Sequence, residues 1–207
     1  MIEEIPIAKL DPRQIKQLES ADEVAKANPN YALEIYGAIL KQNQGCLELR
    51  QKLRDLQLKK LQGSTKGLSG ILTKVTSAPF MFRGKGDKDP EGTIAKAEGL
   101  LEKSPANVLA HQMLAEGSSI LGMVNTVVFA YETIRKIQPK DIKNLKQLGN
   151  AYLDAGDSDM AIKTGNTIRQ INPSDGEAED LLKRASVAVA MNKGKWEESE
   201  DYRAQLK

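Results

Sequence analysis

The sequence has little from which a catalytic or metal-binding cluster could be built. Among 207 residues there is one cysteine, Cys46, and one histidine, His111. A disulfide needs two cysteines, and zinc or iron sites draw on several cysteine or histidine ligands. We therefore expect no internal disulfide, no metal and no cofactor, and a reducing compartment. We interpret His111 as a packing or groove residue. We interpret Cys46 as an inert small side chain, although the position of Cys46 near a helix start could lower the pKa of its thiol.

Long apolar runs and a strong net charge are also missing. No uninterrupted apolar stretch approaches the roughly 18–20 residues that a membrane-spanning helix needs. Residues 1–10 contain Glu3 and Glu4 and lack a basic start followed by an apolar core, so they do not indicate a secretory signal. The formal net charge of +2 is too small to indicate nucleic-acid binding by the whole chain. We expect a cytoplasmic protein without a nucleic-acid partner.

Aromatic residues are scarce, but aliphatic residues are not. Phe, Trp and Tyr make up 4% of the chain, whereas hydrophobic residues make up 40% and consist mostly of Leu, Ile, Val and Ala. A chain of this length and composition can bury a genuine core. Small and aliphatic side chains suit helices that pack closely against each other. The composition favours an all-α fold.

Three prolines recur at a fixed spacing in the second half of the chain. Pro105, Pro139 and Pro173 are each 34 residues apart. Because proline is not tolerated inside a helix, each should end one helix and can open the next. A fixed period of this length indicates a repeating unit built from two helices.

The copy of the repeat between the last two prolines shows the helical pattern most clearly. Leu145, Leu148 and Tyr152 are spaced i, i+3 and i+7, which places them on one face of a helix that a neighbour can bury. The small residues Gly149 and Ala161 should allow the two helices of this hairpin to cross closely.

Turn residues separate the two helices of this copy. Gly156 suits the left-handed conformation that ends a helix, and Asp157 can accept hydrogen bonds from the free amides of the next helix. With these features the segment 148–162 resembles the consensus of the tetratricopeptide repeat, whose period is 34 residues. The signature positions are occupied by Leu145, Leu148, Gly149, Tyr152, Gly156, Asp157, Ala161, Ile162, Ile168, Ile171 and Pro173.

The resemblance to this family is strong over residues 90–182 and weaker over 29–61. It implies a short right-handed solenoid of antiparallel helix pairs. Residues 90–191 would then form repeats ended by a capping helix, and residues 1–62 would form divergent N-terminal helices. Residues 192–207 would form a tail or a further helix.

An insertion at residues 63–89 interrupts the repeat pattern. The stretch 59–88 contains seven basic residues and one acid, which gives it a charge of +6. An apolar stripe followed by aromatic residues suggests a short amphipathic helix that contacts another surface. This surface is either the N-terminal helices of the chain itself, a partner protein or an anionic membrane. The candidate contact residues are Leu68, Ile71, Leu72, Val75, Phe80 and Phe82.

In the tetratricopeptide family the first helix of each repeat lines a concave groove that binds peptides or helices. The resemblance therefore implies a groove formed by Leu109, Gln112, Glu116, Lys143, Lys146, Asn150, Leu153 and Asp154. Lys146 and Asn150 match the first two residues of the family's carboxylate clamp, but Leu181 stands where its next asparagine is needed.

These features point to binding and not to catalysis. We expect a protein-interaction scaffold or adaptor, not an enzyme, that binds a peptide or helix of another protein in this groove. The alternative is a membrane-associated helper that uses the basic insertion 63–89. The identity of the partner and the oligomeric state do not follow from the residues.

Overall fold

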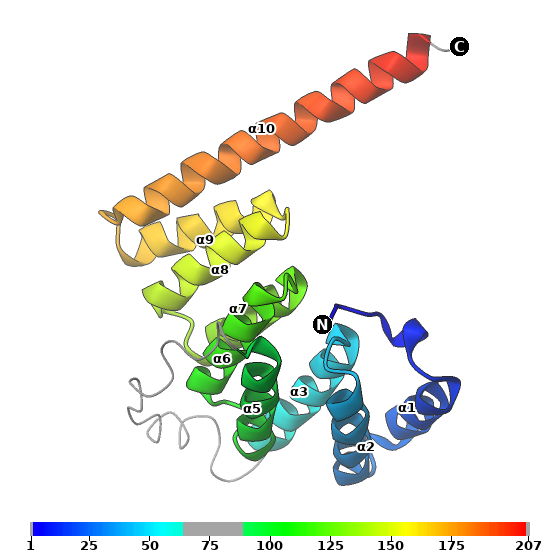
Figure 1. Cartoon of the computed structure of the whole chain (residues 1–207). Coiled ribbons are helices and arrows are strands. Elements are labelled where there is room, and N and C mark those ends of the chain that lie inside the picture. Colours follow the sequence, from blue (N-terminus) through cyan, green and yellow to red (C-terminus); the bar gives the residue numbers. More distant parts are fainter. Residues whose placement is uncertain (1, 64–88, 206–207) are drawn as a thin grey trace. The chain divides into compact units, whose positions relative to one another are not determined.

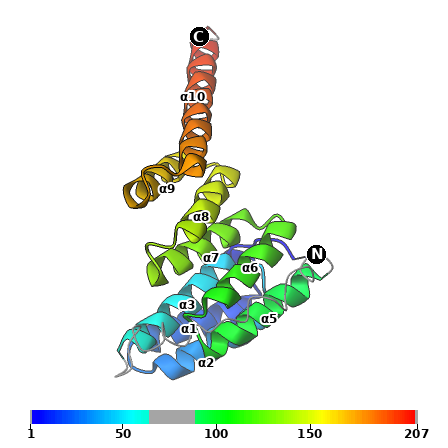
Figure 2. The ribbon, with the colours of Figure 1, turned by 90° about the vertical axis from the view of Figure 1, so that its left-hand side faces the viewer.

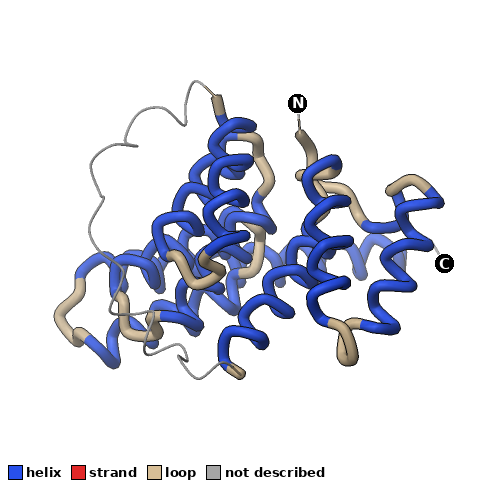
Figure 3. The backbone as a smooth tube through the Cα atoms, turned by 90° about the horizontal axis from the view of Figure 1, so that it is seen from below, coloured by secondary structure: helices blue, strands red, loops and turns tan. Residues whose placement is uncertain are grey.

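The structure is a computed structural model that describes residues 2–63 and 89–205, with side chains described up to residue 192. Over these ranges the chain consists of helices joined by loops and turns (Figure 3), with an isolated bridge between Ile5 and Cys46. The predicted all-α fold is confirmed. Contacts divide the chain into two compact units, Met1–Ile137 and Gln138–Lys207.

The first unit begins with a short 3-10 helix and continues in pairs of α-helices (Figure 1). Helix α1 packs along α2 and α2 along α3, while α5 packs along α6 and α6 along α7. Figure 2 shows α5 and α6 running side by side. The elements are η1 (Ile7–Lys9), α1 (Pro12–Val24), α2 (Pro29–Gln42), α3 (Leu47–Gln62), α5 (Pro90–Lys103), α6 (Val108–Ile120) and α7 (Val124–Ile137).

Short polar side chains start most of these helices. Each accepts a hydrogen bond from a backbone amide in the first turn, which satisfies a donor that the helix itself leaves free. At α1, α2 and α5 a proline follows directly, with the backbone angle that a first helical residue needs. The capping residues in both units are Asp11, Asn28, Asp89, Asn107, Asp141, Asp157 and Asp175.

Helix ends follow the proline spacing. Helices α5, α7 and α9 (Ser158–Ile171) each end two residues before one of the repeated prolines. The predicted helix boundaries at Pro105, Pro139 and Pro173 are confirmed. Gly156 has φ +79°, and Asp157 accepts from the amide of Met160 at 3.1 Å, so both predicted turn roles are also confirmed.

The second unit consists of α8 (Ile142–Asp154), α9 (Ser158–Ile171) and α10 (Gly176–Gln205). The predicted stripe of Leu145, Leu148 and Tyr152 is buried. Helix α10 packs on α8 and α9 through its first turns and then continues past them (Figure 1). The predicted capping helix and tail are one continuous helix.

The role predicted for Gly149 is wrong in one respect. An added Cβ at this position would overlap the side chain of Leu181 on α10, and no atom of α9 is among its nearest neighbours. The nearest atoms that a side chain at position 149 would meet therefore lie on the following helix α10. Gly165 on α9 meets α10 in the same way, because its Cβ would lie 2.8 Å from Leu182 Cγ.

The N-terminal segment ties distant helices of the first unit together. The amide of Ile5 donates to the carbonyl of Gly45 at 3.0 Å, directly before α3. The carboxylate of Glu4 accepts from the amide and hydroxyl of Thr126 at 2.6 and 2.7 Å, and from Asn125 Nδ2 at 2.8 Å. Glu4 therefore caps the N-terminus of α7 from a position more than 120 residues away.

None of the described helices is both long and apolar enough to cross a bilayer. The predicted contact residues of the insertion, from Leu68 to Phe82, lie outside the described residues.

Candidate functional site

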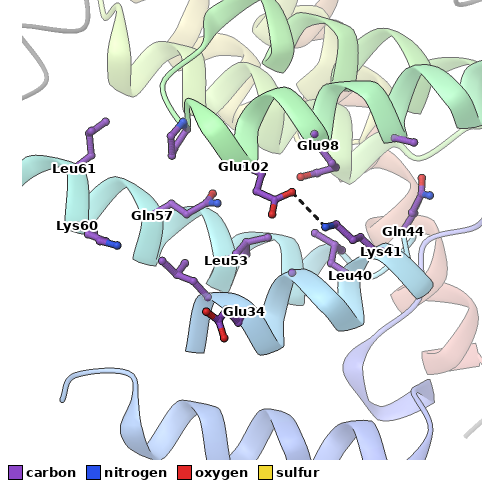
Figure 4. Close-up of a pocket in the computed structure, with 15 residues that line it drawn as sticks. Glu34, Leu40, Lys41, Gln44, Leu53, Gln57, Lys60, Leu61, Glu98 and Glu102 are labelled. Atoms are coloured by element: carbon purple, nitrogen blue, oxygen red, sulfur yellow. Dashed lines mark ion pairs between the residues drawn. The ribbon is translucent and has the colours of Figure 1, made fainter. Parts of the chain in front are cut away.

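A pocket of about 450 Å³ lies between α2, α3 and α5 of the first unit (Figure 4). We call it the α2–α3–α5 groove. Its apolar wall includes four leucines, of which two are buried and two are half-buried, and exposed charged residues stand at its rim. These leucines are Leu33, Leu40, Leu53 and Leu61.

Two glycines in the middle of helices give the groove its open walls. Gly37 lies in α2 and Gly99 in α5, and an added Cβ at either position would meet no atom within 4 Å among the described residues. Three other glycines inside helices are different, because Gly117, Gly149 and Gly165 each contact a packed neighbour. Gly37 and Gly99 therefore have the form of helix contact points without a neighbouring helix among the described residues.

One exposed ion pair spans the groove. Lys41 of α2 and Glu102 of α5 point toward each other, with 3.3 Å between Nζ and Oε2 (Figure 4). Both side chains are more than 60% exposed, and exposed pairs of this kind contribute about 0–1 kcal/mol. The pair is therefore easily opened by a ligand that enters the groove.

Buried charges join α3 to α5 at the floor of the groove. Arg50 and Arg54 are one helical turn apart on α3 and are 0% and 1% exposed. Arg50 Nε donates to Glu98 Oε1 and Arg54 Nη2 donates to Glu98 Oε2, both at 2.7 Å. Arg54 Nη1 also donates to the carbonyl of Leu101 at 3.2 Å. Outside such side-chain bridges, α3 and α5 are not among the closely packed helix pairs of the described chain.

The two guanidinium groups determine the charge state of this cluster. Burial pushes the pKa of Glu98 upward, but the combined attraction and hydrogen bonding of Arg50 and Arg54 hold it below its ordinary value. Two cations share one anion, so the cluster carries a net charge of +1. Arg50 Nη1 and Arg54 Nε have no hydrogen-bond partner within the described part of the chain. A cluster with unmet donors is a costly way to join two helices.

His111 lies beside this cluster and is fully buried, which confirms the interpretation as a packing residue. Its Nε2 is 3.0 Å from the carbonyl oxygen of Pro105. Burial, together with repulsion from Arg54, lowers the pKa of His111 to about 4, so the ring is neutral at pH 7.

The suggestion that the helix start lowers the pKa of the Cys46 thiol is wrong. Cys46 stands at the start of α3, but its side chain is 0% exposed and burial raises the pKa of the thiol. An apolar environment disfavours the charged thiolate, so the interpretation as an inert small side chain is consistent with the structure.

Two residues of the predicted peptide groove on α8, Lys146 and Asn150, already bind other side chains of the protein. Lys146 Nζ lies 2.9 Å from a carboxylate oxygen of Asp175 and 2.9 Å from one of Glu177, and hydrogen bonding to Glu177 raises its pKa. Asn150 Oδ1 accepts from Arg184 Nη2 at 2.7 Å. A peptide carboxylate that bound here would have to displace these partners.

The other predicted groove residues have mixed exposure. On α8, Lys143 and Asp154 are exposed and Leu153 is half-buried. On α6, in the first unit, Glu116 is exposed, while Leu109 and Gln112 are half-buried. Their contact with a partner stays a prediction.

Sequence reasoning did not find the α2–α3–α5 groove. Two signals were present in the residues. Gly37 and Gly99 lie inside apolar helical patterns, where glycine is unfavourable. Arg50 and Arg54 lie one turn apart in the leucine-rich helix 47–62, where a solvent-facing position is the simpler interpretation. Only the hydrogen bonds to Glu98 of α5 and the burial of both side chains show that the arginines point inward.

No group of three or more His, Cys, Asp or Glu side chains is placed to hold a metal ion in the part of the chain that the structure describes.

Comparison with known proteins does not assign the chain to a family. No family model matches the chain, and no curated protein matches it. Among solved structures, the one titled "MamA D159K mutant 1" is 15% identical, with a TM-score of 0.44 over 88% of this chain and 91% of that chain. The structure titled "MamA MSR-1 C2" is 16% identical, with a TM-score of 0.44 over 94% of this chain and 99% of that one. A likeness at this level does not assign the chain to a family.

Proposed function

We propose that the chain is a protein-interaction scaffold that binds an amphipathic helix in the α2–α3–α5 groove. The observation that carries this proposal is the combination of an apolar pocket of about 450 Å³ with Gly37 and Gly99 on its walls. An amphipathic helix in a hydrophobic groove is a recurrent mode of protein recognition.

The glycines favour a helix over a small molecule as the ligand. Glycine inside a helix costs about 0.5–1 kcal/mol relative to alanine, and neither Gly37 nor Gly99 makes room for a described neighbour. Within the same chain, Gly149 and Gly165 make room for the helix α10. The same function at Gly37 and Gly99 requires a further helix in the groove.

The rim indicates how such a helix is oriented. Glu34 and Lys41 on α2, Lys60 on α3 and Glu102 on α5 place both signs of charge around an apolar wall. A ligand helix with apolar residues at i, i+3, i+4 and i+7 would bury that stripe and keep its polar face at the charged rim. Rim charges contribute mainly to specificity and association rate, while the apolar wall supplies affinity.

A selection from random helices tests this function and does not require that the natural partner be identified. A displayed library of random helices about 20 residues long is selected on the full chain, and the enriched sequences are measured by calorimetry. We expect apolar residues at i, i+3, i+4 and i+7. Binding should be lost in the double variant Gly37→Leu, Gly99→Leu, in which leucine side chains fill the groove.

The control is a variant with two leucines on exposed helix positions away from the groove, Glu19→Leu with Lys96→Leu. It adds the same apolar surface and should bind the enriched helices like the wild type. Equal binding by the groove-filled variant, with circular dichroism showing that it is folded, would contradict the proposal.

The membrane alternative depends on the insertion 63–89, whose contact residues lie outside the described part of the chain. It stays a prediction, and vesicle sedimentation of the full chain with anionic lipid tests it.

A further inference from the structure

We propose that the resting occupant of the α2–α3–α5 groove is the chain's own segment 68–82, which a partner helix must displace. This inference rests on the proposed function of the groove. The segment would be the neighbour that Gly37 and Gly99 lack among the described residues, and the scaffold would be self-occupied.

The path of the chain supports this occupant. Helix α3 ends at Gln62 and α5 begins at Pro90, and both helices line the groove. Leu61, one residue before the end of α3, is itself part of the wall. The chain between them therefore leaves one side of the groove and returns to another.

The length of this connection is sufficient. Residues 63–67 and 83–89 can each span at least about 16 Å at about 3.3 Å per residue. In helical form, the stripe from Leu68 to Val75 would measure about 10 Å, which fits along the stretch of about 12 Å from Leu53 to Leu61 on α3. The segment can therefore lie along the wall without strain in its connections.

The chemistry of the segment matches the groove. Leu68, Ile71, Leu72 and Val75 have the i, i+3, i+4, i+7 spacing of a helix that is apolar on one face. Left in water, this surface would be an unusually large exposed apolar patch. Lys66 and Lys74 accompany the stripe, and Glu34 offers a carboxylate at the rim, where Glu102 is paired with Lys41.

Tethering gives the segment an advantage over a free ligand. A short linker holds a tethered group at an effective concentration in the millimolar range. A partner helix of modest affinity would therefore not enter the groove unless it bound more tightly than the segment. The consequence is a scaffold that ignores weak apolar helices and responds to a specific one.

Photo-crosslinking in the full chain tests the occupant directly. Benzoylphenylalanine replaces Lys41 at the rim, and crosslinked peptides are identified by mass spectrometry in an equal mixture of ¹⁵N-labelled and unlabelled chains. We expect crosslinks to residues 68–82 within one chain. The control is the same probe at Lys96 of α5, which does not line the groove and should not crosslink to that segment.

Three outcomes would overturn the inference. They are crosslinks from Lys41 that avoid residues 68–82, crosslinks that join labelled to unlabelled chains, and equal crosslinking from Lys96. A link between differently labelled chains would instead assign the groove to a second copy.

A second variant separates this inference from the proposed function. Leu68, Ile71, Leu72 and Val75 are all replaced by serine, and the helices selected from the library are measured against this chain and the wild type. We expect loss of the crosslink and binding that is tighter by on the order of tenfold or more. Equal affinity for both chains would overturn self-occupation and leave the helix-binding function intact. If Lys41 crosslinks to residues 68–82 but no library helix binds either chain, self-occupation would stand and the helix-binding function would be overturned.

Discussion

Arg54 of α3 and Glu98 of α5 are joined by a hydrogen bond of 2.7 Å between Nη2 and Oε2, in a site where Arg54 is 1% exposed. Because Arg50 bonds the other oxygen of the same carboxylate, Glu98 is the anion that both buried cations share. The charge balance of this join therefore depends on one carboxylate, while the carbonyl of Leu101 accepts a further hydrogen bond from Arg54.

Replacement of Glu98 by glutamine should destabilise the first unit strongly. Glu98→Gln leaves Arg50 and Arg54 buried and repelling each other, and loss of one partner from a buried ion pair typically costs about 3–5 kcal/mol. Urea unfolding followed by circular dichroism measures the change. Lys41→Gln is the matched control, because it removes only the exposed pair with Glu102 and should cost no more than about 1 kcal/mol. Similar losses in both variants would contradict the role of the buried cluster.

His111 should make the protein less stable in mild acid. Its pKa in the folded chain is about 4, below the unfolded value near 6.5, so the fold favours the neutral ring. This contribution is fully present above pH 6.5 and is lost as the pH falls from 6.5 to about 4. The shift corresponds to roughly 3 kcal/mol at 1.36 kcal/mol per pKa unit.

The measurement is the free energy of unfolding at pH 7, 6, 5 and 4.5 for the wild type and for His111→Gln. The variant should lose the dependence on pH between 6.5 and 4.5, whatever its stability at pH 7. Glu98 gives a separate loss of stability at lower pH. Because its pKa is lowered, its carboxylate is still ionised at pH 5, and this loss begins only when the carboxylate is protonated. Parallel pH curves for the two chains would contradict the assignment to His111.

Gly149→Ala should weaken the contact between α8 and α10. The new Cβ overlaps the Cδ2 atom of Leu181, and overpacking of this kind costs about 1–3 kcal/mol. The double variant Gly149→Ala, Leu181→Ala should recover part of that loss, because the smaller side chain makes room. A double-mutant cycle from thermal unfolding gives the coupling. Additive effects would show that the two residues do not meet.

Glu4→Ala should destabilise the first turn of α7. The carboxylate of Glu4 caps this turn at Thr126, and loss of a helix cap typically costs about 1 kcal/mol. Hydrogen exchange of the Thr126 amide should become faster, while amides in the middle of α7 change less. Glu3→Ala is the control, since Glu3 is an exposed acid one residue away from the cap. Unchanged exchange at Thr126 would contradict the cap.

Local rules were enough to predict the helices of the second half of the chain. The proline spacing, Gly156 and Asp157 determine helix ends through backbone geometry and capping, which depend on residues a few positions apart. The burial of Leu145, Leu148 and Tyr152 follows from helical periodicity for the same reason. Each of these features could be read from a short window of sequence.

Contacts between distant segments were decided only by the tertiary structure. Nothing near Glu4 in the sequence shows that it caps α7, and nothing near Gly149 shows that Leu181 of α10 lies nearest to it. Two arginines one helical turn apart, such as Arg50 and Arg54, are typical of a solvent-exposed helix face. They form a buried cluster here because α5 brings Glu98 to them. The burial of the arginine cluster and the open walls at Gly37 and Gly99 depend on which helices meet. A periodic pattern cannot predict them, because it describes one helix at a time. The sequence by itself therefore determined where these helices begin and end and which of their faces are apolar, while tertiary packing decided where the groove lies.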